Sequence, residues 1–391
     1  MTPPPAAARV LVTGGAGFIG SNLTRYLVLE LSAQVVNLDK LTYAGNRESV
    51  ADLEARPGYR LVQADIADAE TVRGVLEDLR PELVMHLAAE SHVDRSIEGP
   101  GPFVQTNLVG TYVLLEEARR YWSRLGAADR ERFRFLAVST DEVYGSAAET
   151  GSFDEGAPYN PSSPYAATKA GSDHLVRAYH RTYGLPVLVT SCCNNYGPYQ
   201  FPEKLIPLVI TRALRGEQLP VYGRGQQIRD WIYVGDHCQA LWLVARRGLP
   251  GATYNIGADA ERRNLQTVET LCDLLQELRP PAGNPELRRP LDHYRELIHF
   301  VEDRPGHDYR YAIDSTRMRR ELGWRPAESF ESGLRQTVRW YLQHREWVER
   351  ILSGEYRGWI EKNYAHRLQG EATASLSAVP ALDVDSIPPR R

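Results

Sequence analysis

Short apolar runs alternate with amphipathic stretches along the first part of the chain. The apolar runs are rich in Val, Leu and Ile, which is typical of strands that are buried on both faces. The expected strands are Arg9–Thr13, Gln34–Leu38, Tyr59–Gln63, Leu83–Leu87 and Phe133–Ser139. The stretches between them have helical spacing and predict helices at Ile19–Leu31, Ala69–Leu79 and Val104–Arg120. A regular succession of strand, helix and strand indicates a parallel sheet with right-handed crossovers.

The later part of the chain predicts a second, smaller lobe. Two further apolar runs, Pro186–Thr190 and Gly251–Ile256, are expected to join the same sheet. From about residue 196 the sequence becomes rich in Gly, Pro, Tyr and Arg, which is typical of loop-dominated binding lobes. We therefore expect an α/β fold, with a doubly wound parallel sheet over residues 9–195, elements that return to it near 230–256, and a loop-rich lobe mainly over 196–366.

Composition excludes several classes of function. The 391 residues include 46 basic and 50 acidic side chains, and this net charge of −4 offers no broad footprint for nucleic acid. No run approaches the roughly 18 apolar residues that a membrane-spanning helix needs. The four cysteines have no CxxC spacing and no HExxH motif occurs, so we expect reduced cysteines, a cytoplasmic location and no metal. Residues 1–8 and 367–391 lack periodicity and are expected to be disordered.

A glycine-rich segment, TGGAGFIG, follows the first expected strand and opens the first expected helix. Gly14 permits a tight turn, Gly17 lets backbone amides approach a pyrophosphate, and Gly20 allows close packing of helix on sheet. Asp39 ends the second strand, where a carboxylate accepts hydrogen bonds from the adenosine ribose. This context predicts a dinucleotide site of the Rossmann type rather than a simple turn.

Charges near the glycine loop bear on the choice of dinucleotide. Asp39 would repel a 2′-phosphate, which favours NAD over NADP, whereas Lys40 beside it would tolerate a phosphate. Asp65, after the third strand, is equally suited to contact the adenine or to form a turn.

One lysine stands out because the chain uses arginine almost everywhere and has only four lysines. Lys169 follows Tyr165 by one helical turn, in a stretch after Pro164 that predicts a helix. The ammonium is expected to lower the pKa of Tyr165, which would make the phenol a base for an alcohol proton. The alternative is a surface pair of Tyr and Lys.

The segment STDEVYG lies at the end of a buried-looking strand, where the ligand crevice of a parallel sheet is found. A hydroxyl there would bond a substrate oxygen beside Tyr165. The carboxylates of Asp141 and Glu142 suit proton abstraction coupled to protonation of a leaving group. The alternative is that both carboxylates cap the following turn.

Six motifs together resemble the extended short-chain dehydrogenase/reductase superfamily and, within it, the dTDP-glucose 4,6-dehydratases. They are TGGAGFIG, DKLTYAGN, HLAAESHVDRSI, STDEVYG, YAATK and NNYGPYQFPEKLIP, and the likeness runs from about Arg9 to Trp340. The resemblance implies NAD as cofactor, dTDP-glucose as substrate, and loss of water to a 4-keto-6-deoxy sugar. It also implies a homodimer formed through the helices containing Val104–Arg120 and Tyr165–Tyr183. Arg224 and the stretch ADAERR before Asn264 differ from the residues that are most common in the family. Arg224 leaves open which nucleotide base the substrate carries.

The resemblance also implies residue roles. Thr140 and Tyr165 would contact the glucose 4-hydroxyl, and Lys169 would hold the nicotinamide ribose. Asp141 would be the acid at the 6-hydroxyl and Glu142 the base at C5. Positions implied around the nucleotide sugar are Ser91, Thr140, Asn194, Lys204, Arg229, Asn264, Arg304 and His307. Positions assigned to NAD are Gly14, Gly17, Phe18, Ile19, Gly20, Asp39, Lys40, Thr42, Asp65, Ile66, Leu87, Ala88, Ala89, Ser91, Thr106, Tyr165, Lys169 and Asn195.

Two other classes of function fit these residues less well. A nucleotide-sugar epimerase or decarboxylase would oxidise C4 but would not need an acid and a base at C5 and C6, so the Asp141–Glu142 pair counts against it. A non-catalytic NAD-binding protein would not need Thr140, Tyr165 and Lys169 together.

Arg229 and Arg304 lie in loops rich in Gly and Pro, where guanidinium groups suit a diphosphate.

Overall fold

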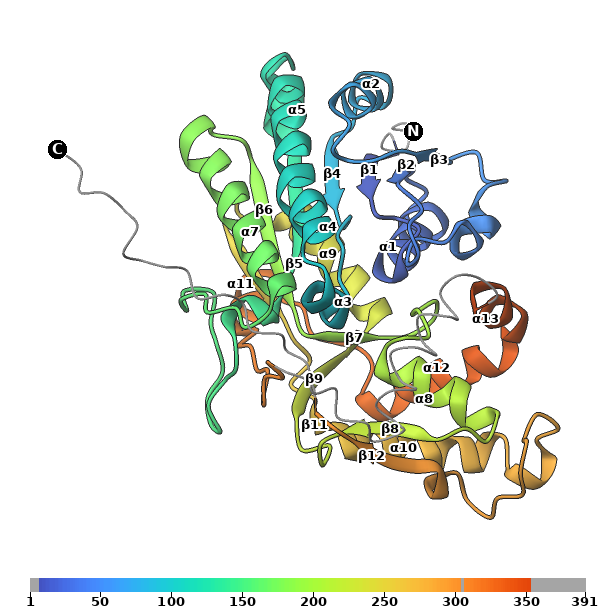
Figure 1. Cartoon of the computed structure of the whole chain (residues 1–391). Coiled ribbons are helices and arrows are strands. Elements are labelled where there is room, and N and C mark those ends of the chain that lie inside the picture. Colours follow the sequence, from blue (N-terminus) through green and yellow to red (C-terminus); the bar gives the residue numbers. More distant parts are fainter. Residues whose placement is uncertain (1–6, 304–305, 353–391) are drawn as a thin grey trace, which may run out of the picture.

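The computed structural model describes residues 7–303 and 306–352. A seven-stranded parallel sheet lies at the centre of the molecule (Figure 1). Its strands are β1 (Arg9–Thr13), β2 (Gln34–Asp39), β3 (Tyr59–Gln63), β4 (Leu83–His86), β5 (Arg134–Thr140), β6 (Val187–Cys192) and β10 (Thr253–Ile256). They follow the order β10-β6-β5-β4-β1-β2-β3, so the direction of winding reverses between β1 and β4. This doubly wound topology confirms the predicted fold class and places a ligand crevice at the carboxyl ends of these strands.

Helices cover both faces of the sheet, which explains why its strands are continuous apolar runs. Val10, Leu11 and Val12 of β1 are completely buried. The helices that pack against one face are α1 (Phe18–Arg25), α9 (Val234–Arg247) and α11 (Thr316–Leu322). Those on the other face are α2 (Ala69–Leu79), α5 (Thr111–Ser123) and α7 (Pro164–Tyr183).

Two predicted helices differ from regular α-helices. The stretch predicted at Ile19–Leu31 is α1 followed by a π-helix, η1 (Tyr26–Glu30). The stretch predicted at Val104–Arg120 begins as a π-helix, η3 (Val104–Gly110), and continues as α5. Apolar spacing indicates helical structure, but it does not distinguish a wider turn from a regular one.

A second lobe lies beyond the main sheet, in the later part of the described chain (Figure 1). It has an apolar core of its own. Its strands form a sheet in the order β11-β9-β7 and a parallel pair β12-β8. Their bounds are β7 (Asn194–Tyr196), β8 (Leu219–Tyr222), β9 (Ile228–Tyr233), β11 (Glu261–Arg263) and β12 (Ile298–Val301). The helices are α8 (Leu205–Leu214), α10 (Asn264–Leu278), α12 (Phe330–Gln343) and α13 (Arg345–Leu352). The lobe is therefore more regular than its sequence predicts, while α9 and β10 return to the main sheet.

Shorter helical segments complete the described chain. They are η2 (Arg47–Leu53), α3 (Val93–Glu98), α4 (Gly101–Phe103), α6 (Ala127–Arg132), η4 (Asp141–Tyr144), η5 (Pro281–Gly283) and η6 (Tyr294–Leu297). Within the described residues, no helix combines the length and the apolar character that crossing a bilayer requires. The four cysteines are buried and free. Residues 1–6 and 353–391 lie outside the described part, so the predictions for the amino-terminal end and for residues 367–391 are not addressed.

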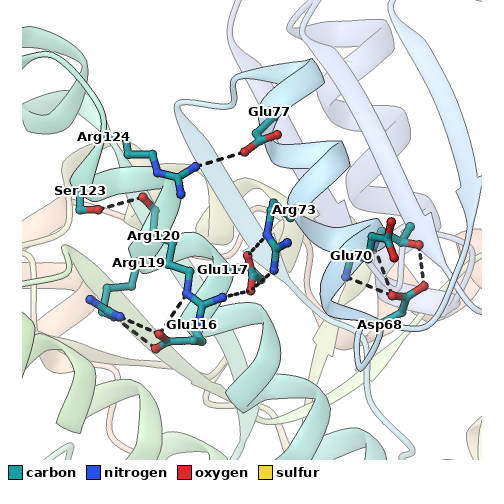
Figure 2. A network of polar contacts seen from close by, with 11 residues as sticks. Asp68, Glu70, Arg73, Glu77, Glu116, Glu117, Arg119, Arg120, Ser123 and Arg124 are labelled. Carbon is teal, nitrogen blue, oxygen red and sulfur yellow. Dashed lines mark hydrogen bonds and ion pairs between the residues drawn. The ribbon is translucent and has the colours of Figure 1, made fainter.

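A charged network joins α2 to α5 (Figure 2). The side chain of Glu117 is only 3% exposed, and its two oxygens accept hydrogen bonds from Arg73 Nε and Nη2 at 2.9 and 3.1 Å. Arg120 Nη1 donates a third bond at 2.8 Å. By contrast, Glu77 is more than half exposed and meets Arg124 alone at 3.3 Å. Glu117 is therefore the buried centre of the network.

Replacing this buried carboxylate should destabilise the fold without affecting any activity. In Glu117→Gln, an amide NH₂ faces guanidinium groups that also donate, so charge-assisted hydrogen bonds are lost. We expect the free energy of unfolding to fall by about 1–2 kcal/mol, measured by urea denaturation. Glu77→Gln is the matched control and should change it by less than about 0.5 kcal/mol. Equal effects of both variants would contradict the central role of Glu117.

Candidate active site

A cavity of about 300 Å³ opens at the carboxyl ends of the central strands, where the strand order reverses. Every position that the sequence assigned to NAD lines it. The same cavity is lined by Thr140, Asp141 and Glu142, and farther along by Asn194 and Lys204. The fold thus brings the glycine loop and the expected catalytic segment, which are far apart in sequence, to one site.

The glycine loop forms a close cradle between β1 and α1. Gly14 has a positive φ of 74°, and a Cβ atom there would lie 2.6 Å from the backbone nitrogen of Ala88. A Cβ atom on Gly20 would lie 2.0 Å from the carbonyl oxygen of Gly14, so helix and strand approach as expected. Gly15, which the sequence analysis did not single out, is equally confined, by Asn37 Oδ1 at 2.3 Å.

The first turn of α1 is suited to an anion. Gly17 is its N-cap residue and has no side chain that accepts hydrogen bonds from the first amides of the helix. These amides, together with the positive end of the helix dipole, favour a phosphate. The cradle therefore fits the pyrophosphate of a dinucleotide.

Asp39 is buried beside this loop. Its carboxylate accepts hydrogen bonds from the backbone nitrogens of Ala16 and Leu41, both at 2.8 Å. Burial raises the pKa of Asp39, and these two amides oppose that shift. Lys40 Nζ lies 2.7 Å from Asp65 Oδ2, so a neighbouring carboxylate offsets the charge that would attract a 2′-phosphate.

Asp65 combines the two alternatives that its sequence position left open. Its Oδ1 accepts a hydrogen bond from the backbone nitrogen of Ala67 at 2.9 Å, which forms a local turn. The residue also lines the cavity. The turn holds the carboxylate at the cavity wall.

At the other end of the cavity, Thr140 ends β5 and caps the short helix η4. Its Oγ1 accepts a hydrogen bond from the backbone nitrogen of Glu142 and donates one to Asp141 Oδ1, both at 3.3 Å. The alternative that the two carboxylates cap this turn is wrong, because the threonine hydroxyl does so. Asp141 is buried, and its Oδ2 has no hydrogen-bond partner within the described part of the chain.

The two adjacent carboxyl groups differ in environment. Burial, together with the charge of Glu142, raises the pKa of Asp141 well above its usual value. Glu142 is only half-buried. Neighbouring carboxyls with such different surroundings suit opposite roles, one holding a proton and the other accepting one.

The elevated pKa of Asp141 makes a prediction about stability. A carboxyl whose pKa is higher in the folded state destabilises the protein as pH rises from about 3.9, its unfolded value, through the folded value. Asp141→Asn removes this buried charge. The free energy of unfolding of the variant should therefore exceed that of the parent protein by an amount that grows as the pH rises above about 3.9, measured by urea denaturation at several pH values. If the difference in free energy of unfolding between the two proteins does not grow between about pH 4 and about pH 7, the raised pKa of Asp141 is contradicted.

Tyr165 and Lys169 both lie on the buried side of α7. Ser163 caps this helix, accepting a hydrogen bond from the backbone nitrogen of Ala166 at 3.1 Å, and Pro164 follows at the first helical position. Tyr165 is 8% and Lys169 6% exposed, which excludes the alternative of a surface pair.

The expected lowering of the pKa of Tyr165 by Lys169 is wrong for this arrangement. Burial and the charge of Glu142 raise the pKa of Tyr165 well above its usual value, and a hydrogen bond with Thr140 opposes them only partly. Lys169 Nζ donates instead to the carbonyl oxygen of Val138 at 2.8 Å. The shared helix face was correctly predicted, but desolvation outweighs the effect of the cation.

At the side of the cavity nearest the second lobe, buried amide oxygens are available to accept hydrogen bonds from a ligand. Asn194 Oδ1 and Gln200 Oε1 are buried and have no hydrogen-bond partner among the described residues. Lys204 Nζ donates to the carbonyl oxygen of Ser91 at 3.2 Å, which joins the lobe to the segment after β4. Gln200 was not singled out by the sequence.

Some residues assigned to the nucleotide sugar do not line the cavity. Arg229 is buried, and its Nη2 donates to the carbonyl oxygen of Asp308 at 2.9 Å while the guanidinium lies 4.1 Å from the ring centre of Tyr311. His307 Nδ1 lies 2.6 Å from Asp303 Oδ1. Asn264 begins α10 with a buried Oδ1 that has no partner in the described chain. Arg304 lies outside the described residues. The roles of these four residues remain predictions.

The structure adds two buried residues that sequence reasoning missed. His237 Nδ1 lies 2.8 Å from Asn195 Oδ1 and fixes that amide at the cavity, and burial lowers the pKa of His237 to about 3. Asp173 accepts a hydrogen bond from Ser139 Oγ at 2.7 Å. Asp173 follows Lys169 by one helical turn, and this spacing is the signal that could have found it, whereas nothing in the sequence points to His237.

Comparison with known proteins gives consistent similarities. The model of the family described as GDP-mannose 4,6 dehydratase matches residues 11–337. The dTDP-glucose 4,6-dehydratase of Salmonella typhimurium is 55% identical, over 92% of this chain and 99% of its own. That of Neisseria meningitidis is 56% identical, over 89% of this chain and 97% of its own.

Solved structures show the same similarity. DesIV, a dTDP-glucose 4,6-dehydratase from Streptomyces venezuelae solved with NAD and TYD bound, has a TM-score of 0.78 at 46% identity, covering 88% of this chain and 99% of its own. The dTDP-glucose 4,6-dehydratase of Bacillus anthracis in complex with NAD has a TM-score of 0.77 at 41% identity, covering 88% and 100%. A UDP-glucose 4-epimerase from Thermus thermophilus with NAD has a TM-score of 0.72 at 30% identity, covering 86% and 99%.

Proposed function

Since the chain belongs to the family described as GDP-mannose 4,6 dehydratase, we propose that it is an NAD-dependent dTDP-glucose 4,6-dehydratase, a carbon–oxygen lyase of deoxysugar biosynthesis. The observation that carries this proposal is the pair Asp141 and Glu142 at the cavity. One carboxyl is buried, which raises the pKa of Asp141 well above its usual value and favours its protonated form, while the other is half-buried. An elimination of water needs an acid and a base that act at neighbouring carbon atoms of the substrate, here C6 and C5.

The residues at the strand ends fit the proposed cofactor. The amides at the start of α1 would hold the pyrophosphate, Asp39 the adenosine ribose, and Lys169 the nicotinamide ribose. When bound, NAD would supply the hydride acceptor for the oxidation at C4 and the hydride donor for the reduction at C6. The reaction is redox-neutral, so the protein's own task is to move protons in the correct order.

The order of these proton transfers follows from carbon acidity. The C5 proton of glucose becomes removable only when C4 is a ketone, so Tyr165 Oη must first take the proton of the 4-hydroxyl. The interaction with the Thr140 hydroxyl lowers the pKa of Tyr165, and this hydroxyl would stabilise the phenolate that the step requires by turning its hydrogen from Asp141 to Tyr165. Glu142 then removes the C5 proton, and Asp141 protonates the C6 hydroxyl, which leaves as water. Finally a proton returns to C5 from Glu142, and the proton that Tyr165 gained is passed through solvent to Asp141, which restores both groups.

The alternative is an epimerase or decarboxylase on the same scaffold. The similarity to the epimerase of Thermus thermophilus, at 30% identity, is lower than that to the dehydratases. Neither alternative reaction needs the acid–base pair of Asp141 and Glu142.

We further propose a homodimer and a cytoplasmic location. The family resemblance implies that two copies meet through η3, α5 and α7. These helices carry the exposed apolar side chains Val104, Val109, Tyr112 and Tyr183. Burying them in a second copy would remove this surface from water. Light scattering on the purified protein should give twice the mass of 44.0 kDa, and a mass of one chain would refute the homodimer. The proposed location follows from the four free cysteines.

Separate incubation with dTDP-glucose, UDP-glucose and GDP-mannose tests the proposed function. Mass spectrometry should detect loss of one water from dTDP-glucose, and from the other two at most slowly. Products of unchanged mass would indicate an epimerase. A fourth incubation, with UDP-glucuronic acid, tests for a decarboxylase, which would release carbon dioxide. Either outcome would overturn the proposal.

A further inference from the structure

Asp173 and Lys169 are two buried residues of opposite charge type whose charges act on one another, and the mechanism above gives a role to Lys169 but none to Asp173. They lie one turn apart on α7, and residues at this spacing share a helix face. Asp173 is 1% exposed and Lys169 6%. Charged side chains buried this deeply require a compensating charge and hydrogen bonds.

The hydrogen bonds of this pair connect α7 to the end of β5. Lys169 Nζ donates to the carbonyl oxygen of Val138 at 2.8 Å. Asp173 Oδ2 accepts from Ser139 Oγ at 2.7 Å, at the next residue of the strand. Thr140 follows directly, so this pair holds the two residues that precede the catalytic segment.

A second donor orients the same carboxylate. The Tyr159 hydroxyl donates to Asp173 Oδ2 at 2.9 Å. Tyr159 also accepts a hydrogen bond from Arg177, which donates to Thr253 Oγ1 at 3.2 Å. The network thus connects β5, α7 and β10 around one carboxylate.

Asp173 is the acidic residue whose charge acts on Lys169: burial raises the pKa of Asp173, and the charge of Lys169 together with the hydrogen bonds from Ser139 and Tyr159 opposes that shift. The other titratable groups that act on Lys169 are His86 from β4 and Cys192 from β6. Burial, with a smaller effect of Lys169, lowers the pKa of His86 to about 3, so this imidazole is neutral. Burial raises the pKa of Cys192 to about 12, so the thiol is neutral too. Burial lowers the pKa of Lys169, and Asp173 is the larger of the two effects that oppose this shift.

We propose that Asp173 is a positioning residue of the active site: its carboxylate supplies the counter-charge of the Lys169 ammonium and anchors the end of β5 that carries Thr140. The importance of this role for catalysis rests on the proposed function, whereas the charge state of Lys169 does not. A lysine in a buried site loses its proton readily unless an anion holds it. The ammonium is the form that would donate to a ribose hydroxyl beside Tyr165.

The charge of Lys169 can be measured without any substrate. The chain has only four lysines, so NMR of protein labelled at the lysine ε-carbon gives few signals, and Lys169→Arg assigns the relevant one. In Asp173→Asn the amide oxygen still accepts from Ser139, but the charge is gone. We expect Lys169 to titrate at lower pH than in the parent protein. An unchanged titration would overturn the proposal.

Catalysis provides the second measurement. In Asp173→Asn, kcat should fall by about 10- to 100-fold, and the alkaline limb of the pH–rate profile should move to lower pH. Asp173→Glu keeps the charge but displaces Ser139, so it should lower kcat while Lys169 titrates nearly as in the parent protein. A Glu variant whose Lys169 titrates as in the Asn variant would contradict the counter-charge.

Asp236→Asn is the matched control. Asp236 is a buried carboxylate on α9 that accepts a hydrogen bond from the backbone nitrogen of Glu328 at 3.0 Å and does not line the cavity. It should leave both the titration of Lys169 and the pH–rate profile unchanged. Equal shifts in the two variants would show a general effect on folding and refute a specific role of Asp173. If the protein does not dehydrate any nucleotide sugar, the NMR result still decides the charge relationship.

Discussion

The variant that combines Asp141→Asn with Glu142→Gln is expected to oxidise the sugar at C4 and then stop. Tyr165 and Lys169 are untouched, so the proton of the 4-hydroxyl can still leave. Neither amide can remove the C5 proton or protonate the C6 hydroxyl, so the overall rate should fall by about a thousandfold or more. After dTDP-glucose is added, the absorbance of the reduced nicotinamide should rise once and then persist.

The single variants serve as controls for this decoupling. Glu142→Gln alone should also accumulate reduced cofactor, because the base acts first after oxidation. Asp141→Asn should fold at least as stably as the parent protein, so its loss of activity cannot be attributed to unfolding. Normal turnover by the double variant would refute the roles of both carboxyl groups.

Tyr165→Phe should fail one step earlier. The phenol is the group placed to take the 4-hydroxyl proton, and removing a general base of this kind costs about 10²- to 10⁴-fold in kcat. The reduced nicotinamide should not accumulate, in contrast to the double variant. Stopped-flow absorbance under single-turnover conditions separates the two behaviours.

Tyr121→Phe is the matched control for the tyrosine. Its hydroxyl is also part-buried and donates to the carbonyl oxygen of Pro81 at 3.1 Å, far from the residues that line the cavity. It should retain the activity of the parent protein. A Tyr165→Phe variant that forms reduced cofactor at the normal rate would show that another group takes the proton.

The parts of the fold that were predictable are those governed by local pattern. The strands of the main sheet were recognisable because both faces are buried, and β1 and β3 have the predicted bounds. The glycine loop was recognisable because Gly14 and Gly20 are required by steric contacts within the loop itself. Their spacing therefore appears directly in the sequence.

The remaining features depend on distant contacts or on burial. The raised pKa of Tyr165 results from desolvation and from Glu142, which only the folded chain brings to the tyrosine. His237 reaches Asn195 because α9 packs beside β7. Arg229 Nη2 donates to the backbone carbonyl of Asp308, a residue 79 positions away in the sequence, and no local pattern indicated this contact. No local spacing in the sequence encodes these long-range contacts.

The central claim is that Glu142 moves the C5 proton while the hydrogen from C4 stays with the sugar. One measurement tests it: unlabelled dTDP-glucose is converted in heavy water, and the product is analysed by NMR. Glu142 is half-buried, so its proton exchanges with solvent, and the product should carry one deuterium at C5 and none in the C6 methyl group. Unlabelled product kept in heavy water without protein corrects for spontaneous exchange. Deuterium in the methyl group, or none at C5, would contradict the account.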